Sequence, residues 1–129
     1  TGLHNEMPDR LALLHVHAHN PHGFAHERRV TEDNVDLNRN FIDHDVARAR
    51  NVEYDRLHNV LVPKDWNERT IAKCDAELEA FIQKHSEMAL QGAITRGQYH
   101  HADGLFYGGT GPTWSRRTCI NIVERYVAG

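Results

Sequence analysis

Asn38 and Arg39 form a pair of adjacent side chains suited to holding a carboxylate. A guanidinium presents a planar fork of donors that matches a carboxylate, and an asparagine amide donates one more hydrogen bond without adding charge. Adjacent residues on a strand point to opposite faces, so both side chains can reach one ligand only from an irregular turn. Asp36 and Asn40, on either side of the pair, favour turns. The pair therefore predicts a carboxylate-binding turn.

The segment around this pair resembles the substrate-anchoring segment of the zinc carboxypeptidases. Residues 34–41 read NVDLNRNF and follow the Arg28-Arg29 pair. In that family an Asn-Arg pair grips the carboxylate end of the substrate, and an upstream arginine polarises the carbonyl under attack. Arg29 stands nine residues before Asn38, as in the family pattern. The resemblance thus assigns carboxylate binding to Asn38 and Arg39, and a catalytic role at the oxyanion to Arg29.

The sequence departs from the family pattern just before this segment. Glu32-Asp33-Asn34 replaces an Asn-x-x-Gly stretch, and the arginine is doubled. Arg28 could therefore take the role assigned to Arg29. Without the family context, an arginine pair beside acidic residues is typical of solvated surface ion pairs.

The resemblance extends along most of the chain and points to a little-characterised bacterial branch of these enzymes. It implies a Zn²⁺ ion whose ligands, a His-x-x-Glu pair and a later His, precede and follow this sequence, as does a Glu general base. We therefore expect no metal ligand here, and residues 1–129 to be a single partial domain, the central portion of a catalytic domain. The matching motifs are Asn-Pro-x-Gly-Phe-Ala at 20–25, Arg-Arg-Val at 28–30, Gly-Gln-Tyr at 97–99, Gly-Leu-Phe-Tyr-Gly-Gly at 104–109 and Pro-Thr-Trp-Ser at 112–115.

The histidines offer a different interpretation. His15, His17 and His19 alternate along an apolar run, so on a strand all three would face one side, and three imidazoles at such spacing can hold zinc with one position open. The resemblance places the zinc ligands elsewhere, which leaves hydrogen bonding to neighbouring loops as the simpler role. The paired His100 and His101 are interpreted as polar loop residues.

One strand and two strong helices are predicted. The apolar run from Leu11 to Ala18 is typical of a strand covered on both faces, as in a parallel sheet. Asp65 and Glu68 form a capping box before a helical periodicity that continues to Gly92, and a final helix begins near Thr113. A single strand cannot form a stable sheet. We therefore expect an α/β fold, part of a doubly wound and mostly parallel sheet with flanking helices, whose other strands lie outside this chain.

Composition excludes several classes of protein. The formal charge is −3, from 15 basic and 18 acidic residues that are interspersed, so no basic stripe favours a nucleic acid. No run approaches the length of a membrane span, so no membrane partner is predicted. The two cysteines lie far apart and indicate small core residues in a reducing cytoplasm. Nothing in the sequence indicates an oligomeric state.

The function predicted from these observations is zinc-dependent hydrolysis of an amide bond next to a substrate carboxylate, as in a metallocarboxypeptidase. The chain would supply the anchor and the oxyanion arginine. Two alternatives remain open. One is a deacylase similar to aspartoacylase and succinylglutamate desuccinylase, which act on small N-acyl amino acids; the other is a module that binds carboxylates without catalysis. Substrate preference for peptides separates the first, and binding that is insensitive to chelators, without turnover, identifies the second.

Overall fold

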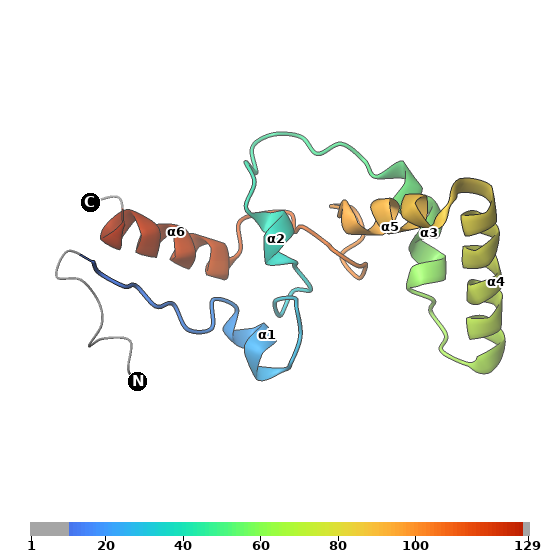
Figure 1. Cartoon of the computed structure of the whole chain (residues 1–129), viewed down its shortest axis with the longest axis horizontal. Helices are drawn as coiled ribbons and strands as arrows, with labels where there is room; N and C mark the ends of the chain where they lie inside the picture. The colour runs from blue at the N-terminus through green and yellow to red at the C-terminus, as the bar shows by residue number, and fades with distance from the viewer. Residues whose placement is uncertain (1–10, 128–129) are drawn as a thin grey trace.

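The computed structural model describes residues 11–127, and this part of the chain forms six helices and no β-strand. The molecule is elongated (Figure 1), with α3, α4 and α5 grouped at one end and α6 beside the N-terminal segment at the other. The short helices α1 and α2 lie between these groups. The helices are α1 (Pro21–Ala25), α2 (Leu37–Asn40), α3 (Val52–Leu61), α4 (Glu68–His85), α5 (Glu87–Thr95) and α6 (Trp114–Tyr126).

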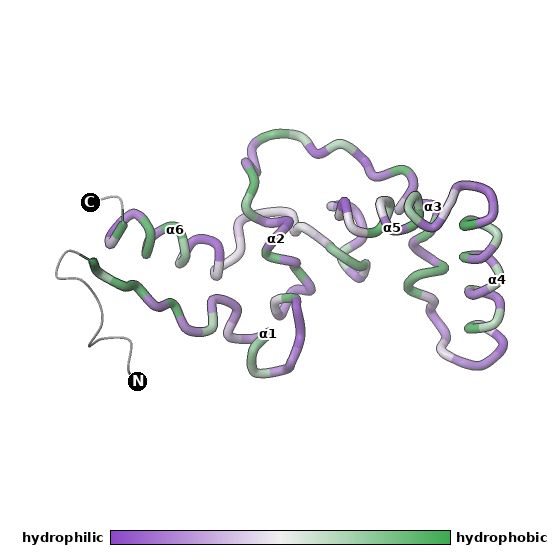
Figure 2. Tube along the Cα trace, viewed as in Figure 1, coloured by the Kyte–Doolittle hydropathy of each residue, from purple (hydrophilic) through white to green (hydrophobic). Residues whose placement is uncertain are grey.

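The predicted α/β fold, with part of a doubly wound parallel sheet, is wrong for the part of the chain that the structure describes. Residues 11–18 run without regular secondary structure and are largely exposed, although they form an apolar stretch (Figure 2). Between residues 11 and 127 the only bridge is an isolated one between Gln98 and Tyr107. A strand needs a neighbour to satisfy its backbone groups, and among the described residues no other strand pairs with this run.

Local capping determines where the helices begin. The side chains of Asn51, Asn67, Ser86 and Thr113 each accept a hydrogen bond from a backbone N–H in the first turn of the helix that follows. Such caps satisfy donors that have no partner within the helix. The predicted helix from about Thr113 is confirmed as α6. The predicted cap at Asp65 is wrong, because Asn67 holds that position.

Ser86 divides what the periodicity predicted as one helix into α4 and α5. Its φ of 99° lies in a region that residues other than glycine rarely adopt, and its hydroxyl caps α5. Because the helix is broken at Ser86, α5 packs against both α3 and α4. α1 and α3 fall in parts of the sequence where no helix was predicted above.

The fully buried apolar core is small and lies near α3, α5 and the loop of residues 97–112. Its members are Val35, Tyr54, Leu57, Ala93 and Tyr107. α4 buries none of its side chains completely. None of the described helices combines the length and apolar character needed to cross a membrane.

Candidate functional site

The predicted anchor residues lie on α2, whose start is fixed by a buried carboxylate. Asp36 is 2% exposed, and its Oδ1 accepts a hydrogen bond from the backbone N–H of Asn38 at 3.0 Å. An aspartate at this position caps the helix and favours its first turn. The side chain of Asn38 is exposed. Asn38 and Arg39 thus lie on a single turn of α-helix, where the sequence predicted an irregular turn.

Arg29 is drawn to the anchor by the same carboxylate. Its Nε donates to Asp36 Oδ2 at 3.1 Å, while about half of the arginine side chain, 55%, remains exposed. The Arg29 guanidinium also lies over the ring of Phe106, with Cζ 5.1 Å from the ring centroid. A cation over an aromatic face is attracted by the ring quadrupole. Arg29 therefore pairs with a buried aspartate and does not form the surface ion pairs considered above.

The guanidinium of Arg39 lies over the same aromatic ring, that of Phe106. Its Cζ lies 5.6 Å from the Phe106 centroid. The terminal nitrogens donate to two backbone carbonyls, Asn38 O at 3.2 Å and Thr95 O, so each keeps a second N–H for a ligand. Tyr99 Oη donates to the Arg39 carbonyl at 2.8 Å and fixes its backbone. Phe106 thus carries two guanidinium groups.

Gly97 provides the space that the Arg39 side chain occupies. A Cβ atom at this position would lie 2.6 Å from Arg39 Cδ and 2.8 Å from Arg39 Nε. The backbone φ of Gly97 is +84°, which also disfavours other residues. Gly97 therefore permits a close approach between α2 and the loop of residues 97–112.

Asn40 fastens α2 to that loop and to α6. Its side chain is completely buried, and its amide donates to Gly108 O at 2.8 Å and to Gly111 O at 2.9 Å. Asn40 Oδ1 accepts from the backbone N–H of Thr113 at 2.9 Å and from its hydroxyl at 3.1 Å. All four hydrogen-bonding positions of this amide are used, so Asn40 has a structural role next to the exposed Asn38.

A cavity of about 410 Å³ opens beside Arg29. Arg29, Asp36 and Phe106 line it together with the apolar side chains of Leu61 and Leu105. A cavity with apolar walls and a few converging polar groups is the usual form of a small-molecule site. The cavity is thus lined both by Arg29 and by Leu61, the last residue of α3.

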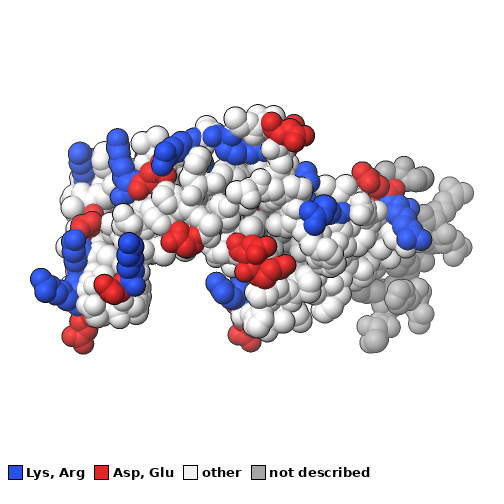
Figure 3. Space-filling view, turned by 180° about the vertical axis from the view of Figure 1, so that it is seen from behind, with Lys and Arg blue, Asp and Glu red and all other residues white. Residues whose placement is uncertain are grey.

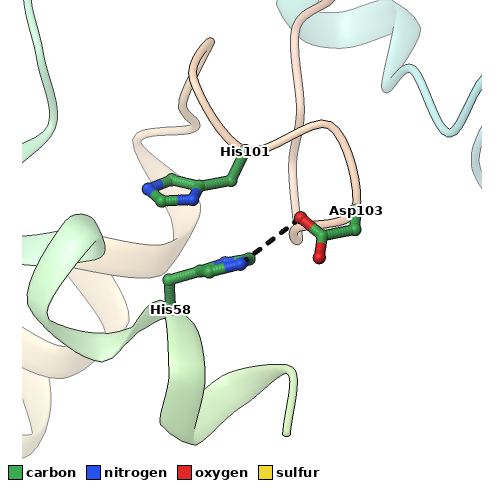
Figure 4. Close-up of side chains that lie close together, drawn as sticks. All are labelled: His58, His101 and Asp103. Carbon is green, nitrogen blue, oxygen red and sulfur yellow. Dashed lines mark ion pairs between the residues drawn. The ribbon is translucent and has the colours of Figure 1, made fainter. Parts of the chain in front are cut away.

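A second group of polar residues lies between α3 and the loop of residues 97–112. His58 on α3 and His101 on the loop stack with ring centroids 3.9 Å apart, and Asp103 lies at the edge of the stack (Figure 4). His58 Nε2 is 3.3 Å from Asp103 Oδ1. The ligand atoms of these three residues all lie within 4.8 Å of one another, so the group could hold a metal ion.

Asp55 and Tyr54 support this His-Asp group from α3. Burial alone would raise the pKa of the Asp55 carboxyl, but hydrogen bonds from His101 at 2.8 Å and Arg50 at 2.6 Å hold that pKa below its usual value. Asp55 is therefore a carboxylate at neutral pH. Burial raises the pKa of the Tyr54 hydroxyl, which accepts a hydrogen bond from the backbone N–H of Leu105 at 2.6 Å.

The alternative three-histidine site does not form. His17 packs against Phe24 with ring centroids 5.1 Å apart, and His19 donates to the carbonyl of Ser115 at 3.0 Å. Within residues 11–127 the single group of histidine and acidic side chains close enough to share an ion is that of His58, His101 and Asp103. The hydrogen bond of His19 reaches the first turn of α6, whereas the simpler expectation was a contact with a neighbouring loop.

Sequence reasoning missed several residues that complete these arrangements. Phe106 was noted only within the Gly-Leu-Phe-Tyr-Gly-Gly motif and Asp36 only as a turn former, and no role was predicted for His58 or Asp103. The helix cap was a readable signal for Asp36, since an aspartate two residues before Asn38 favours a helix start. No local signal marks the others, because their partners lie far away in the sequence.

The described residues thus form a helical scaffold that holds a pair of arginines over one aromatic ring, beside a His-Asp group. Acidic and basic side chains are intermixed on the face shown in Figure 3. A family model described as "Protein of unknown function (DUF2817)" matches residues 2–129, and the chain therefore belongs to this family. Searches of curated proteins and of solved structures gave no significant match.

Proposed function

We propose that this chain binds the carboxylate end of an amide substrate and takes part in its zinc-dependent hydrolysis, as in a metallocarboxypeptidase. The convergence of Arg29 and Arg39 on Phe106, at 5.1 and 5.6 Å from the ring centroid, gives the strongest support. Two cations on one ring repel each other, and an anionic ligand between them would relieve this repulsion. The partly apolar cavity beside Arg29 suits an organic anion.

The roles follow from which donors remain available. Arg39 keeps an N–H on each terminal nitrogen, and the exposed Asn38 amide is next to it, so this pair binds the carboxylate. Arg29 is bound to Asp36 through Nε alone, which leaves its terminal nitrogens for an oxyanion. Arg28 also lines the cavity, but Arg29 has both the buried partner and the ring contact, which favours Arg29 for this role.

Zinc in such an enzyme supplies an activated water and polarises the substrate carbonyl. The His-x-x-Glu pattern that the resemblance associates with this ion does not occur in the 129 residues. The roles proposed for this chain are therefore limited to holding the carboxylate and stabilising the oxyanion.

The anchor is tested by binding of N-acetylphenylalanine and of its methylamide, which lacks the carboxylate, followed by NMR. We expect the acid to shift the resonances of Asn38 and Arg39 and the methylamide to leave them unchanged. Arg39→Ala should weaken binding of the acid at least about 10-fold, because a charge-assisted hydrogen bond is removed. Arg69→Ala, on the exposed surface of α4, is the control. Equal binding of acid and methylamide would rule out a carboxylate anchor.

Turnover is tested with the protein as it occurs in the cell, using an N-acyl dipeptide and an N-acetyl amino acid. We expect chelator-sensitive release of the C-terminal residue from the dipeptide, and Arg29→Ala should lower kcat by about 100- to 1,000-fold. Preference for the N-acetyl amino acid would instead identify a deacylase. Binding without turnover, unaffected by chelators, would identify a carboxylate-binding module.

A further inference from the structure

The group formed by His58, His101 and Asp103 connects two parts of the chain that are distant in sequence. His58 comes from α3, and the other two residues come from the loop of residues 97–112 (Figure 4). We propose that these three side chains bind a divalent transition-metal ion such as Zn²⁺ or Co²⁺. This site is separate from the zinc site that the resemblance implies, and it does not depend on the proposed hydrolase.

The donor set suits this class of ion. Two imidazoles and one carboxylate are typical ligands of zinc and of neighbouring first-row metals, whereas calcium and magnesium prefer oxygen ligands alone. His58 Nε2 and Asp103 Oδ1 are 3.3 Å apart. In a tetrahedral site with bonds of about 2.0–2.1 Å, two ligand atoms are separated by roughly 3.4 Å. This pair therefore already has the spacing of two ligands on one ion.

A carboxylate outside the group orients His101. Its Nε2 donates to Asp55 Oδ1 at 2.8 Å, which leaves Nδ1 with a lone pair for the metal. Arg50 holds Asp55 in turn through a contact of 2.6 Å. Histidines that bind metals commonly have their second nitrogen fixed by a carboxylate in this way, which sets the tautomer and raises the basicity of the ligand.

His58 adds a buried imidazole whose polar atoms are not fully used. The residue is 9% exposed, and Nδ1 is buried without a hydrogen-bond partner among the described residues. A buried polar nitrogen without a partner costs free energy, so the apo arrangement of His58 is not fully satisfied. An ion at this site would bond to His58 Nε2 and to the Asp103 carboxylate, whose side chain is 71% exposed and free to adjust; it does not supply a partner for Nδ1.

Binding changes the arrangement of the two rings. The His58 and His101 planes are now inclined by 23° in a stack, but an imidazole coordinates a metal in the plane of its ring. The ion must therefore turn one ring out of the stack. We expect large changes in the imidazole resonances of both histidines when the metal binds.

The position of Asp103 gives the ion a place in the larger site. Asp103 lines the same cavity of about 410 Å³ as Arg29 and Phe106. A bound cation would therefore add positive charge to the lining of the cavity that Arg29 also lines, which favours an anionic ligand there.

The test is a titration of the chelator-treated full chain with Zn²⁺ by calorimetry and with Co²⁺ by visible spectroscopy. With eleven histidines in the chain, weak binding elsewhere must be separated from this site, and His100 next to His101 offers a matched control. We expect one ion per chain, and affinity at least about 10-fold lower in His101→Asn and Asp103→Asn. His100→Asn should bind as the unaltered protein does.

Two results would overturn the proposal. One is the absence of 1:1 binding of either ion to the unaltered chain. The other is binding of equal affinity in His101→Asn, Asp103→Asn and His100→Asn, which would show that ions bind at scattered surface histidines only.

Discussion

A single buried carboxylate, that of Asp36, connects the residues of the anchor. One oxygen caps α2 at Asn38, and the other accepts from Arg29 at 3.1 Å. Because Asp36 is 2% exposed, loss of its partner would leave a charge away from water, which is costly. Asp36 therefore holds Arg29 and α2 in a fixed relation, and the two proposed roles depend on each other through it.

Tyr54 performs a similar function for Leu105, a residue that lines the cavity. Its hydroxyl accepts the backbone N–H of Leu105 at 2.6 Å. In Tyr54→Phe that part-buried N–H loses its partner, so we expect the Leu105 amide to exchange faster with solvent, by a factor equivalent to about 0.5–1.5 kcal/mol. Hydrogen exchange measured by NMR gives this value directly. Tyr126→Phe, at an exposed position of α6, should leave the exchange unchanged.

The same tyrosine makes the structure sensitive to alkali. Burial raises the Tyr54 pKa above its usual value of 10.0, so the folded state holds this proton more tightly than the unfolded state. The stability that follows is complete below about pH 10 and decreases as the pH rises toward the raised pKa. Ultraviolet titration should show one of the four tyrosines ionising later than the others, and Tyr54→Phe should remove that late step. Four coincident titrations would contradict this expectation.

At the scale of elements, the approach of α2 to the loop after α5 depends on Gly97. An alanine Cβ there would meet the Arg39 side chain at 2.6 Å and would have to adopt a φ of +84°. We expect Gly97→Ala to displace Arg39 and to weaken binding of N-acetylphenylalanine by about 10-fold or more. The change is measured in the same NMR titration as the anchor itself.

Gly92 is the matched control, because it lies inside α5 with nothing within 4 Å of an added Cβ. Gly92→Ala should leave carboxylate binding unchanged and should stabilise α5 by about 0.5–1 kcal/mol through its better helix propensity. Equal weakening of binding by both substitutions would show that the effect does not come from contact with Arg39.

The sequence allows prediction of those elements that local interactions determine. Periodicity and capping are local, and they located the bodies of α4 and α6. The apolar periodicity continues across Ser86 and does not indicate the break there, so α4 and α5 were predicted as one helix. The apolar run before His19 suited a strand, but a strand is stable only beside neighbours that the run itself cannot specify.

The residues of the candidate site also include some that the local sequence predicts and some that it does not. Arg29, Asn38 and Arg39 stand close together in the sequence, so their motif could be recognised. Phe106 and the His58–Asp103 contact join segments that fold together from a distance, and they became visible only in the structure. Chemistry on one segment is readable in sequence, whereas chemistry shared between segments is not.

The whole molecule has little core relative to its exposed apolar surface. Between residues 11 and 127 five apolar residues are buried, while Leu11, Phe24, Trp66 and Met88 are among the large apolar side chains that are exposed. Burial of apolar area is the main favourable term in folding. We therefore expect the 129-residue chain, purified alone, to unfold over a broad temperature range in calorimetry. A sharp transition of a monomer, with equal calorimetric and van't Hoff enthalpies, would contradict this.

The hydrogen bonds that fasten Asn40 also impose an order of assembly during translation. They join residues 68 to 73 positions apart, from Gly108 to Thr113. At about 5–20 residues per second, a ribosome needs roughly 4–15 s to add the residues between Asn40 and its last partner. In that interval α3, α4 and α5 emerge and can pack locally. Arg29 and Arg39 cannot contact Phe106 until that residue has been added. The nascent chain therefore contains Asn38 and Arg39 well before the loop that fixes their positions has been synthesised.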